Sequence, residues 1–62
     1  MEEDKIKFTK IFAGLPEKIK SEDIIVVIDE NPYTWSAAYF EINNDSEIGK
    51  RILKKLKDLE II

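Results

Sequence analysis

Few residues of this 62-residue chain could carry out covalent chemistry. The chain has no cysteine and no histidine, so the usual thiol nucleophile and the usual general base are both missing. Ser36 therefore has no plausible partner for a catalytic triad. The two glycines, Gly14 and Gly49, match neither a dinucleotide-binding loop nor a P-loop. These residue types indicate a protein that is not an enzyme and that uses no cofactor.

Two pairs of adjacent carboxylates are the remaining candidates for a metal site. Either pair, Glu22–Asp23 or Asp29–Glu30, could contact a hard cation. Both pairs lie in expected turns, however, where solvated carboxylates are common without any function. The segment Asn43–Glu47 offers several oxygen atoms, but it lacks the spacing and the glycine of a calcium loop. We expect no metal ion, since zinc, haem and iron–sulfur sites would also lack their usual ligands.

The clearest charge feature is a basic stretch near the C-terminus. Its cations are Lys50, Arg51, Lys54, Lys55 and Lys57, and no acidic residue lies among them. Such a stripe can contact the phosphates of a nucleic acid. The net charge of −3 argues against this, because nucleic-acid-binding domains are typically basic. A solvated helix face explains the lysines equally well, and in a dimer the stripe could meet the acidic N-terminus or the two acidic turns.

The length allows one domain, residues 1–62. A chain this short buries only about 60% of the surface that its unfolded form exposes. Because disulfides are impossible, stability must come from very good packing or from a second subunit. Residues 1–4 are expected to be flexible and do not resemble a secretory signal, and the apolar run 24–28 is too short to span a bilayer, so we expect a cytoplasmic protein. Abundant isoleucine, lysine and glutamate indicate a thermophilic, archaeal source, although an AT-rich mesophile would show a similar bias.

Hydrophobic periodicity predicts the elements. Residues 5–13 and 34–42 alternate apolar and polar side chains, as strands do, and residues 24–28 form a β-branched run typical of a central strand. Residues 17–20 follow a proline and are expected to form one short helical turn. Residues 45–60 show helical spacing, with Asn44 or Asp45 as N-cap. The predicted fold is therefore α+β: a three-stranded, mostly antiparallel sheet, β-β-β-α in sequence order, with one C-terminal amphipathic helix packed on one face.

One helix can cover only one face of such a sheet, so the other face would be exposed. The residues assigned to this outer face are Ile11, Ile25, Val27, Trp35, Ala37 and Tyr39. A patch of this size is larger than most monomers expose. The leading hypothesis is therefore a homodimer that forms through this face. Two alternatives stay open: residues 15–20 fold over the face, or its aromatic rings form a ligand platform.

These features lead to two main hypotheses about function. The first is a non-enzymatic interaction or structural module that forms a homodimer and has a possible protein partner. The alternative is a nucleic-acid-binding or antitoxin-like regulatory module that uses the basic helix or the Trp35/Tyr39 face. An enzyme or a small-molecule binder is the least supported class, and nothing in the sequence predicts attachment to a membrane.

Overall fold

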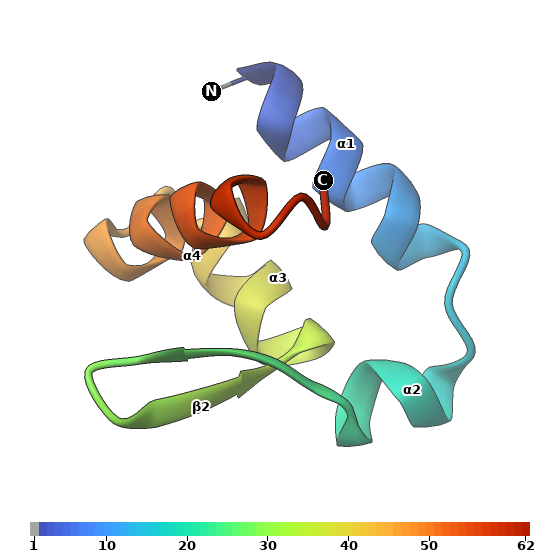
Figure 1. Ribbon diagram of the computed structural model, residues 1–62. Coiled ribbons are helices and arrows are strands. Elements are labelled where there is room, and N and C mark those ends of the chain that lie inside the picture. The colour runs from blue at the N-terminus through green and yellow to red at the C-terminus, as the bar shows by residue number, and fades with distance from the viewer. Residues whose placement is uncertain (1) are drawn as a thin grey trace.

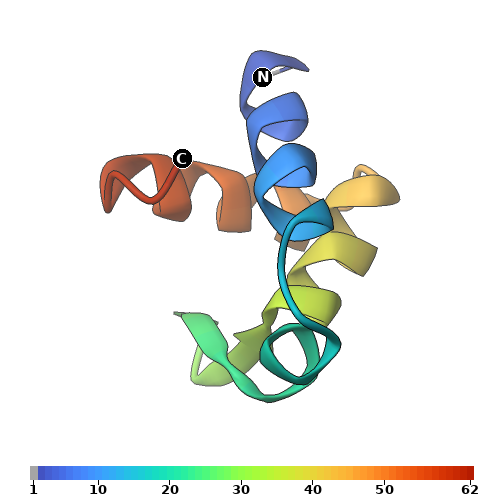
Figure 2. The same ribbon diagram turned by 90° about the vertical axis from the view of Figure 1, so that its right-hand side faces the viewer.

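The computed structural model describes residues 2–62, which form four helices and one two-stranded antiparallel sheet (Figure 1). In chain order the elements are α1 (Glu2–Ala13), α2 (Glu17–Glu22), β1 (Ile24–Ile28), β2 (Asn31–Thr34), α3 (Trp35–Asn43) and α4 (Glu47–Asp58). The hairpin and α2 lie at one end of the molecule and α1 lies at the other (Figure 1). Helices α3 and α4 cross between these ends, as the perpendicular view also shows (Figure 2).

The prediction of a three-stranded sheet with one helix is wrong. Residues 5–13, expected to be a strand, belong to α1. Phe8 and Phe12 fit the alternation of a strand, but they are also four residues apart and so share one face of a helix. Their rings stack with centroids 6.2 Å apart, and Phe8 is fully buried. Tertiary packing of this aromatic face therefore favours the helix over a strand.

The predicted third strand, residues 34–42, is also helical. Thr34 acts as the N-cap of α3, because its hydroxyl oxygen accepts a hydrogen bond from the Ala37 N–H at 3.2 Å. The buried residues of α3 are Trp35, Ala38 and Ile42, which recur at helical spacing. Strand β2 is consequently only four residues long and ends at the cap.

The predicted C-terminal helix is present as α4, but it is shorter than the predicted range of 45–60. Its N-cap is Ser46 rather than Asn44 or Asp45. The short helix expected at 17–20 is present as α2 and extends to Glu22. Of the segment 1–4, which was expected to be flexible, Met1 lies outside the described residues and the others form the first turn of α1.

The predicted strand 24–28 is present as β1, and it pairs with the segment that follows, as expected of a hairpin. It is not the centre of a sheet, since β2 is its only partner strand within residues 2–62. The connecting loop is Asp29–Glu30, with φ angles of 50° and 71°. These values fit a type I′ hairpin turn, which requires positive φ at both central residues.

The pairing of β1 with β2 is irregular at one place. Near the start of β1 a β-bulge leaves Ile25 without an opposite residue.

One apolar core joins α1, β1, α3 and α4. Its buried residues are Phe8, Val26, Ile28, Trp35, Ala38, Ile42, Ile52 and Leu56. The Phe8 and Trp35 rings lie 5.7 Å apart. The indole N–H of Trp35 donates to Asp23 Oδ2 at 3.3 Å, so burial of this side chain leaves its polar atom satisfied.

Both α3 and α4 end in a Schellman motif that is closed by an acidic residue instead of glycine. After α4, the Ile61 N–H donates to the Leu56 carbonyl and the Glu60 N–H donates to the Lys57 carbonyl, while Glu60 has a φ of 59°. After α3, Asp45 has the equivalent position with a φ of 53°. A residue with a Cβ atom is strained in this left-handed region.

Replacing Glu60 by glycine is therefore expected to stabilise the protein by about 1 kcal/mol, because glycine reaches the left-handed region without strain. In a domain of this size that corresponds to a rise in Tm of about 4–8 °C, measurable by circular dichroism. Glu60→Ala is the matched control, since it removes the same charge but keeps Cβ. An equal rise in both variants would show that the charge, not the backbone, is responsible.

Candidate functional site

The exposed face of α4 carries the basic residues that the sequence singled out. The helix begins at Ser46, whose hydroxyl accepts a hydrogen bond from the Gly49 N–H at 2.9 Å and donates one to Glu41 Oε1 at 2.6 Å. Gly49, Ile52 and Leu56 are buried on the inner face of the helix. All five cations between positions 50 and 57 are exposed. The structure thus places this predicted site on one solvent-facing surface.

Three of the five cations have an acidic partner. Arg51 binds Asp29 through two hydrogen bonds of 2.6 and 3.0 Å, which connect α4 to the hairpin turn. Lys57 lies 3.6 Å from Asp4 of α1, and Lys50 lies 4.0 Å from Glu47. The sequence suggested that in a dimer the basic stretch meets the acidic N-terminus or the acidic turns. Asp4 and Asp29 come from these segments, but here they belong to the same chain as the cations. Within residues 2–62, Lys54 and Lys55 form no salt bridge.

The Arg51–Asp29 pair changes the acidity of both groups. Hydrogen bonds from Arg51, and then its positive charge, lower the pKa of Asp29 below its ordinary value, and the same contacts raise the pKa of Arg51. A carboxyl group with a lowered pKa contributes stability above its unfolded pKa and loses it as the pH falls through the folded value. The pair is therefore intact at neutral pH and holds the turn against α4.

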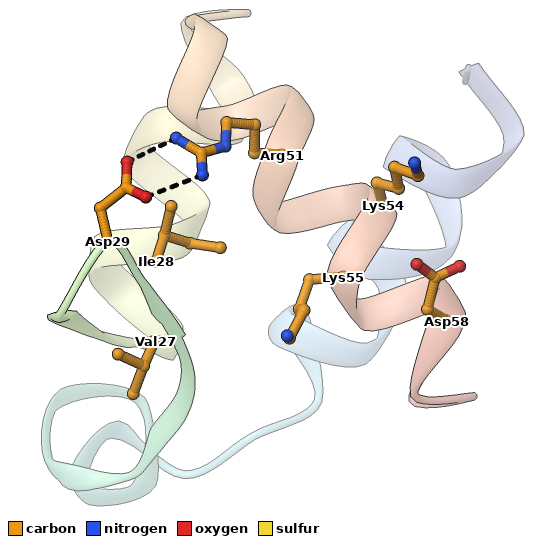
Figure 3. A pocket seen from close by; sticks show the side chains of 7 residues that line it. All are labelled: Val27, Ile28, Asp29, Arg51, Lys54, Lys55 and Asp58. Carbon is orange, nitrogen blue, oxygen red and sulfur yellow. Dashed lines mark hydrogen bonds and ion pairs between the residues drawn. The ribbon is translucent and has the colours of Figure 1, made fainter.

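A groove of about 450 Å³ runs between β1 and α4 (Figure 3). Its lining residues are Val27, Ile28, Asp29, Arg51, Lys54, Lys55 and Asp58. The Arg51–Asp29 pair closes one end, and the Lys55 side chain extends from α4 toward the space beside β1 (Figure 3). We call this site the β1–α4 groove. Apart from the Arg51–Asp29 pair, it combines an apolar strand with two cations, Lys54 and Lys55, and one carboxylate, Asp58, none of which forms a salt bridge among residues 2–62.

A second hollow lies on the other side of α4, toward α1. It is lined by Asp4, Lys50, Leu53, Lys54, Lys57 and Asp58. Lys54 and Asp58 line both hollows, so they form the ridge between them. A ligand in the β1–α4 groove can thus reach Lys54 and Lys55 at once.

The residues predicted for the outer sheet face do not form one surface. Trp35, Ala37 and Tyr39 belong to α3, Ile11 belongs to α1, and the other two belong to β1. Trp35 is buried, and Tyr39 stacks on Phe12 with ring centroids 4.4 Å apart. Val27 is the most exposed of the six, at 54%. The homodimer stays a prediction, but the sheet face proposed for it does not exist in this fold.

The two carboxylate pairs have roles in the fold. Asp23 accepts the indole N–H of Trp35, and Asp29 binds Arg51. In the described part of the chain, no group of three acidic side chains could hold a metal ion. Among the same residues, every helix is too short or too polar to cross a membrane.

Sequence reasoning missed the hairpin side of the groove. Asp29 was interpreted as a turn carboxylate that could contact a hard cation or, in a dimer, the basic stretch of a second copy, whereas it binds Arg51 of the same chain, 22 positions away. Nothing in the local pattern around either residue indicates this pair, because it depends on how the hairpin packs on α4. Comparison of the chain with protein-family models, curated proteins and solved structures found no match in any of the three.

Proposed function

We propose that this protein is a non-enzymatic interaction module that binds an acidic segment of a partner protein in the β1–α4 groove. The observation that carries the proposal is the position of Lys54 and Lys55, which line the groove without an acidic partner among residues 2–62. Carboxylates of a ligand would supply the missing opposite charges. Electrostatic complementarity of this kind favours the correct partner and speeds encounter. A cytoplasmic location is part of this proposal.

Two features favour a protein over a nucleic acid as the partner. Arg51, the side chain best suited to bidentate phosphate binding, is already paired with Asp29. Trp35 is buried, and Tyr39 is stacked on Phe12, so neither ring is free to stack on bases beside the groove.

Reversing the two groove charges tests the proposal. The double variant Lys54→Glu/Lys55→Glu is expected to bind a blocked, fluorescently labelled (Glu-Val)₅ peptide at least about tenfold more weakly than the wild type, which corresponds to 1.4 kcal/mol. Each reversal removes one attraction and adds one repulsion at the surface. Fluorescence anisotropy at 0.15 M salt measures the difference.

The matched control is Lys7→Glu/Lys10→Glu, which changes the net charge equally but lies on the exposed surface of α1, outside the groove. It is expected to bind the peptide nearly as well as the wild type. Equal losses in both double variants would contradict the proposal, as would a DNA or RNA duplex that binds more tightly than the peptide.

A further inference from the structure

The side of the β1–α4 groove formed by β1 is an open strand edge. Three consecutive pairs of the hairpin are Ile28↔Asn31, Val27↔Pro32 and Val26↔Tyr33. The two-residue loop makes Ile28 and Asn31 the closing hydrogen-bonded pair. In an antiparallel ladder, hydrogen-bonded and non-hydrogen-bonded pairs alternate. Val27 and Pro32 therefore form a non-hydrogen-bonded pair, and their backbone polar groups point away from the hairpin.

The two outer edges of the hairpin differ in what they can bind. On β2 the outward position is Pro32, which has no N–H to offer, so this edge is blocked against pairing with another chain. On β1 the outward position is Val27, which has both an N–H and a carbonyl. Val27 and Pro32 are a non-hydrogen-bonded pair, and no other backbone group among residues 2–62 bonds to the Val27 N–H or carbonyl. The open edge is thus confined to β1.

The open edge faces the cations. Of the two strands, β1 is the one that packs against α4. Strand β2 lies on the side of β1 that is turned away from α4 (Figure 1). Val27 lines the groove together with Lys54 and Lys55, and its side chain is 54% exposed. An extended chain lying there could pair with the Val27 backbone, while its side chains alternate between Val27 and the cations of α4.

We infer that the β1–α4 groove binds an extended acidic peptide as a third β-strand, paired with β1 at Val27. This inference rests on the proposed function and adds the binding mode and the conformation of the ligand. Main-chain hydrogen bonds then supply affinity, and alternate side chains supply specificity, as in other cases of strand addition. The bulge at Ile25 limits the pairing to the end of β1 next to the turn.

A second copy of this protein fits the same edge less well. Pairing two β1 edges antiparallel would bring Lys54 and Lys55 of both copies into the same region, and like charges at close range oppose association. An acidic peptide meets the same cations with opposite charge. The two lysines of the groove therefore favour an acidic peptide over a second copy.

Amide hydrogen exchange measured by NMR tests the inference directly on the wild-type protein. Saturation with (Glu-Val)₅ is expected to slow exchange of the Val27 amide at least about tenfold, because this N–H becomes hydrogen-bonded. The amides of Val26 and Ile28 are internal references, since their pairs already belong to the ladder and their protection should change little. A peptide of the same sequence that is N-methylated at every residue should bind at least about tenfold more weakly, because it cannot donate main-chain hydrogen bonds.

The outcomes separate this inference from the proposed function. If the peptide binds and the Lys54→Glu/Lys55→Glu variant loses it, but Val27 exchange does not change, strand addition is wrong and the acidic-partner proposal stands. If the peptide does not bind at all, both are wrong. If the Val27 amide is protected without peptide, the protection rises with protein concentration, and sedimentation velocity shows a dimer, then β1 pairs with a second copy of the protein. That result would contradict the peptide inference.

Discussion

Gly49→Ala is expected to destabilise the protein by about 3 kcal/mol or more, which is close to the whole stability of a domain this small. A Cβ atom at position 49 would lie 2.3 Å from the Glu41 carbonyl oxygen, 2.6 Å from the Glu41 carbonyl carbon and 2.9 Å from the Ile42 Cα. All three atoms belong to the backbone of α3, so no flexible side chain can move to make room. The two helices must separate, and Ile52 and Leu56 then lose part of their packing in the core.

Whether Gly49→Ala lowers or raises the stability distinguishes close packing of α3 on α4 from an ordinary position in a helix. In an ordinary helix interior, replacing glycine by alanine stabilises by about 1 kcal/mol. Gly14→Ala is the matched control, because its Cβ would be 3.7 Å from the nearest backbone atom, which is an ordinary contact. This control should be neutral or slightly stabilising. Urea denaturation followed by circular dichroism measures both variants, and a stable Gly49→Ala protein would contradict the close approach of α3 and α4.

Phe8→Ala is expected to cost about 3–5 kcal/mol, because a fully buried aromatic side chain is lost and a cavity remains. Phe8 has no exposed surface and contacts the rings of Phe12 and Trp35. Its removal separates α1 from the core. The variant should be largely unfolded at 25 °C, and the fluorescence of Trp35, the only tryptophan, should shift to the red as the ring becomes exposed to water.

Phe40→Ala is the control for this experiment, since Phe40 is 64% exposed on α3. The same change of residue type at this surface position is expected to alter the stability by no more than about 0.5 kcal/mol. The strand prediction for residues 34–42 would have placed Phe40 inward, against the C-terminal helix. That arrangement also placed Phe8 inward, so comparably large losses in both variants would support it and contradict the exposed position of Phe40 on α3.

Some elements follow from local sequence. The run Ile24–Ile28 is β-branched throughout, and Asp29–Glu30 follows directly, so the strand and its turn are evident without tertiary information. Helix α4 is equally evident, because its apolar residues recur at helical spacing over three turns and its basic residues follow the acid at its start. The exposed basic surface, one side of the candidate site, follows from the same pattern.

Residues 5–13 and 34–42 were ambiguous for a physical reason. Phe8 and Phe12, four residues apart, share one face of either a strand or a helix. In residues 34–42, Phe40 and Ile42 fit the period of a strand, whereas Trp35, Ala38 and Ile42 fit that of a helix. The decision came from contacts between elements: Phe12 stacks on Tyr39, and Trp35 packs on Phe8 while its indole N–H binds Asp23. Such contacts join residues far apart in the chain, and no local pattern encodes them.

By itself, then, the sequence determined that this is a short chain without cysteine or histidine, with one β-branched strand and one amphipathic helix whose outer face is basic. Only the tertiary structure decided that the apolar residues assigned to an outer sheet face are divided among α1, β1 and α3. It also decided that Asp29 pairs with Arg51, leaving Lys54 and Lys55 beside the open edge of β1. The reason is that charge and periodicity are properties of single segments, whereas a groove exists only between segments that pack together.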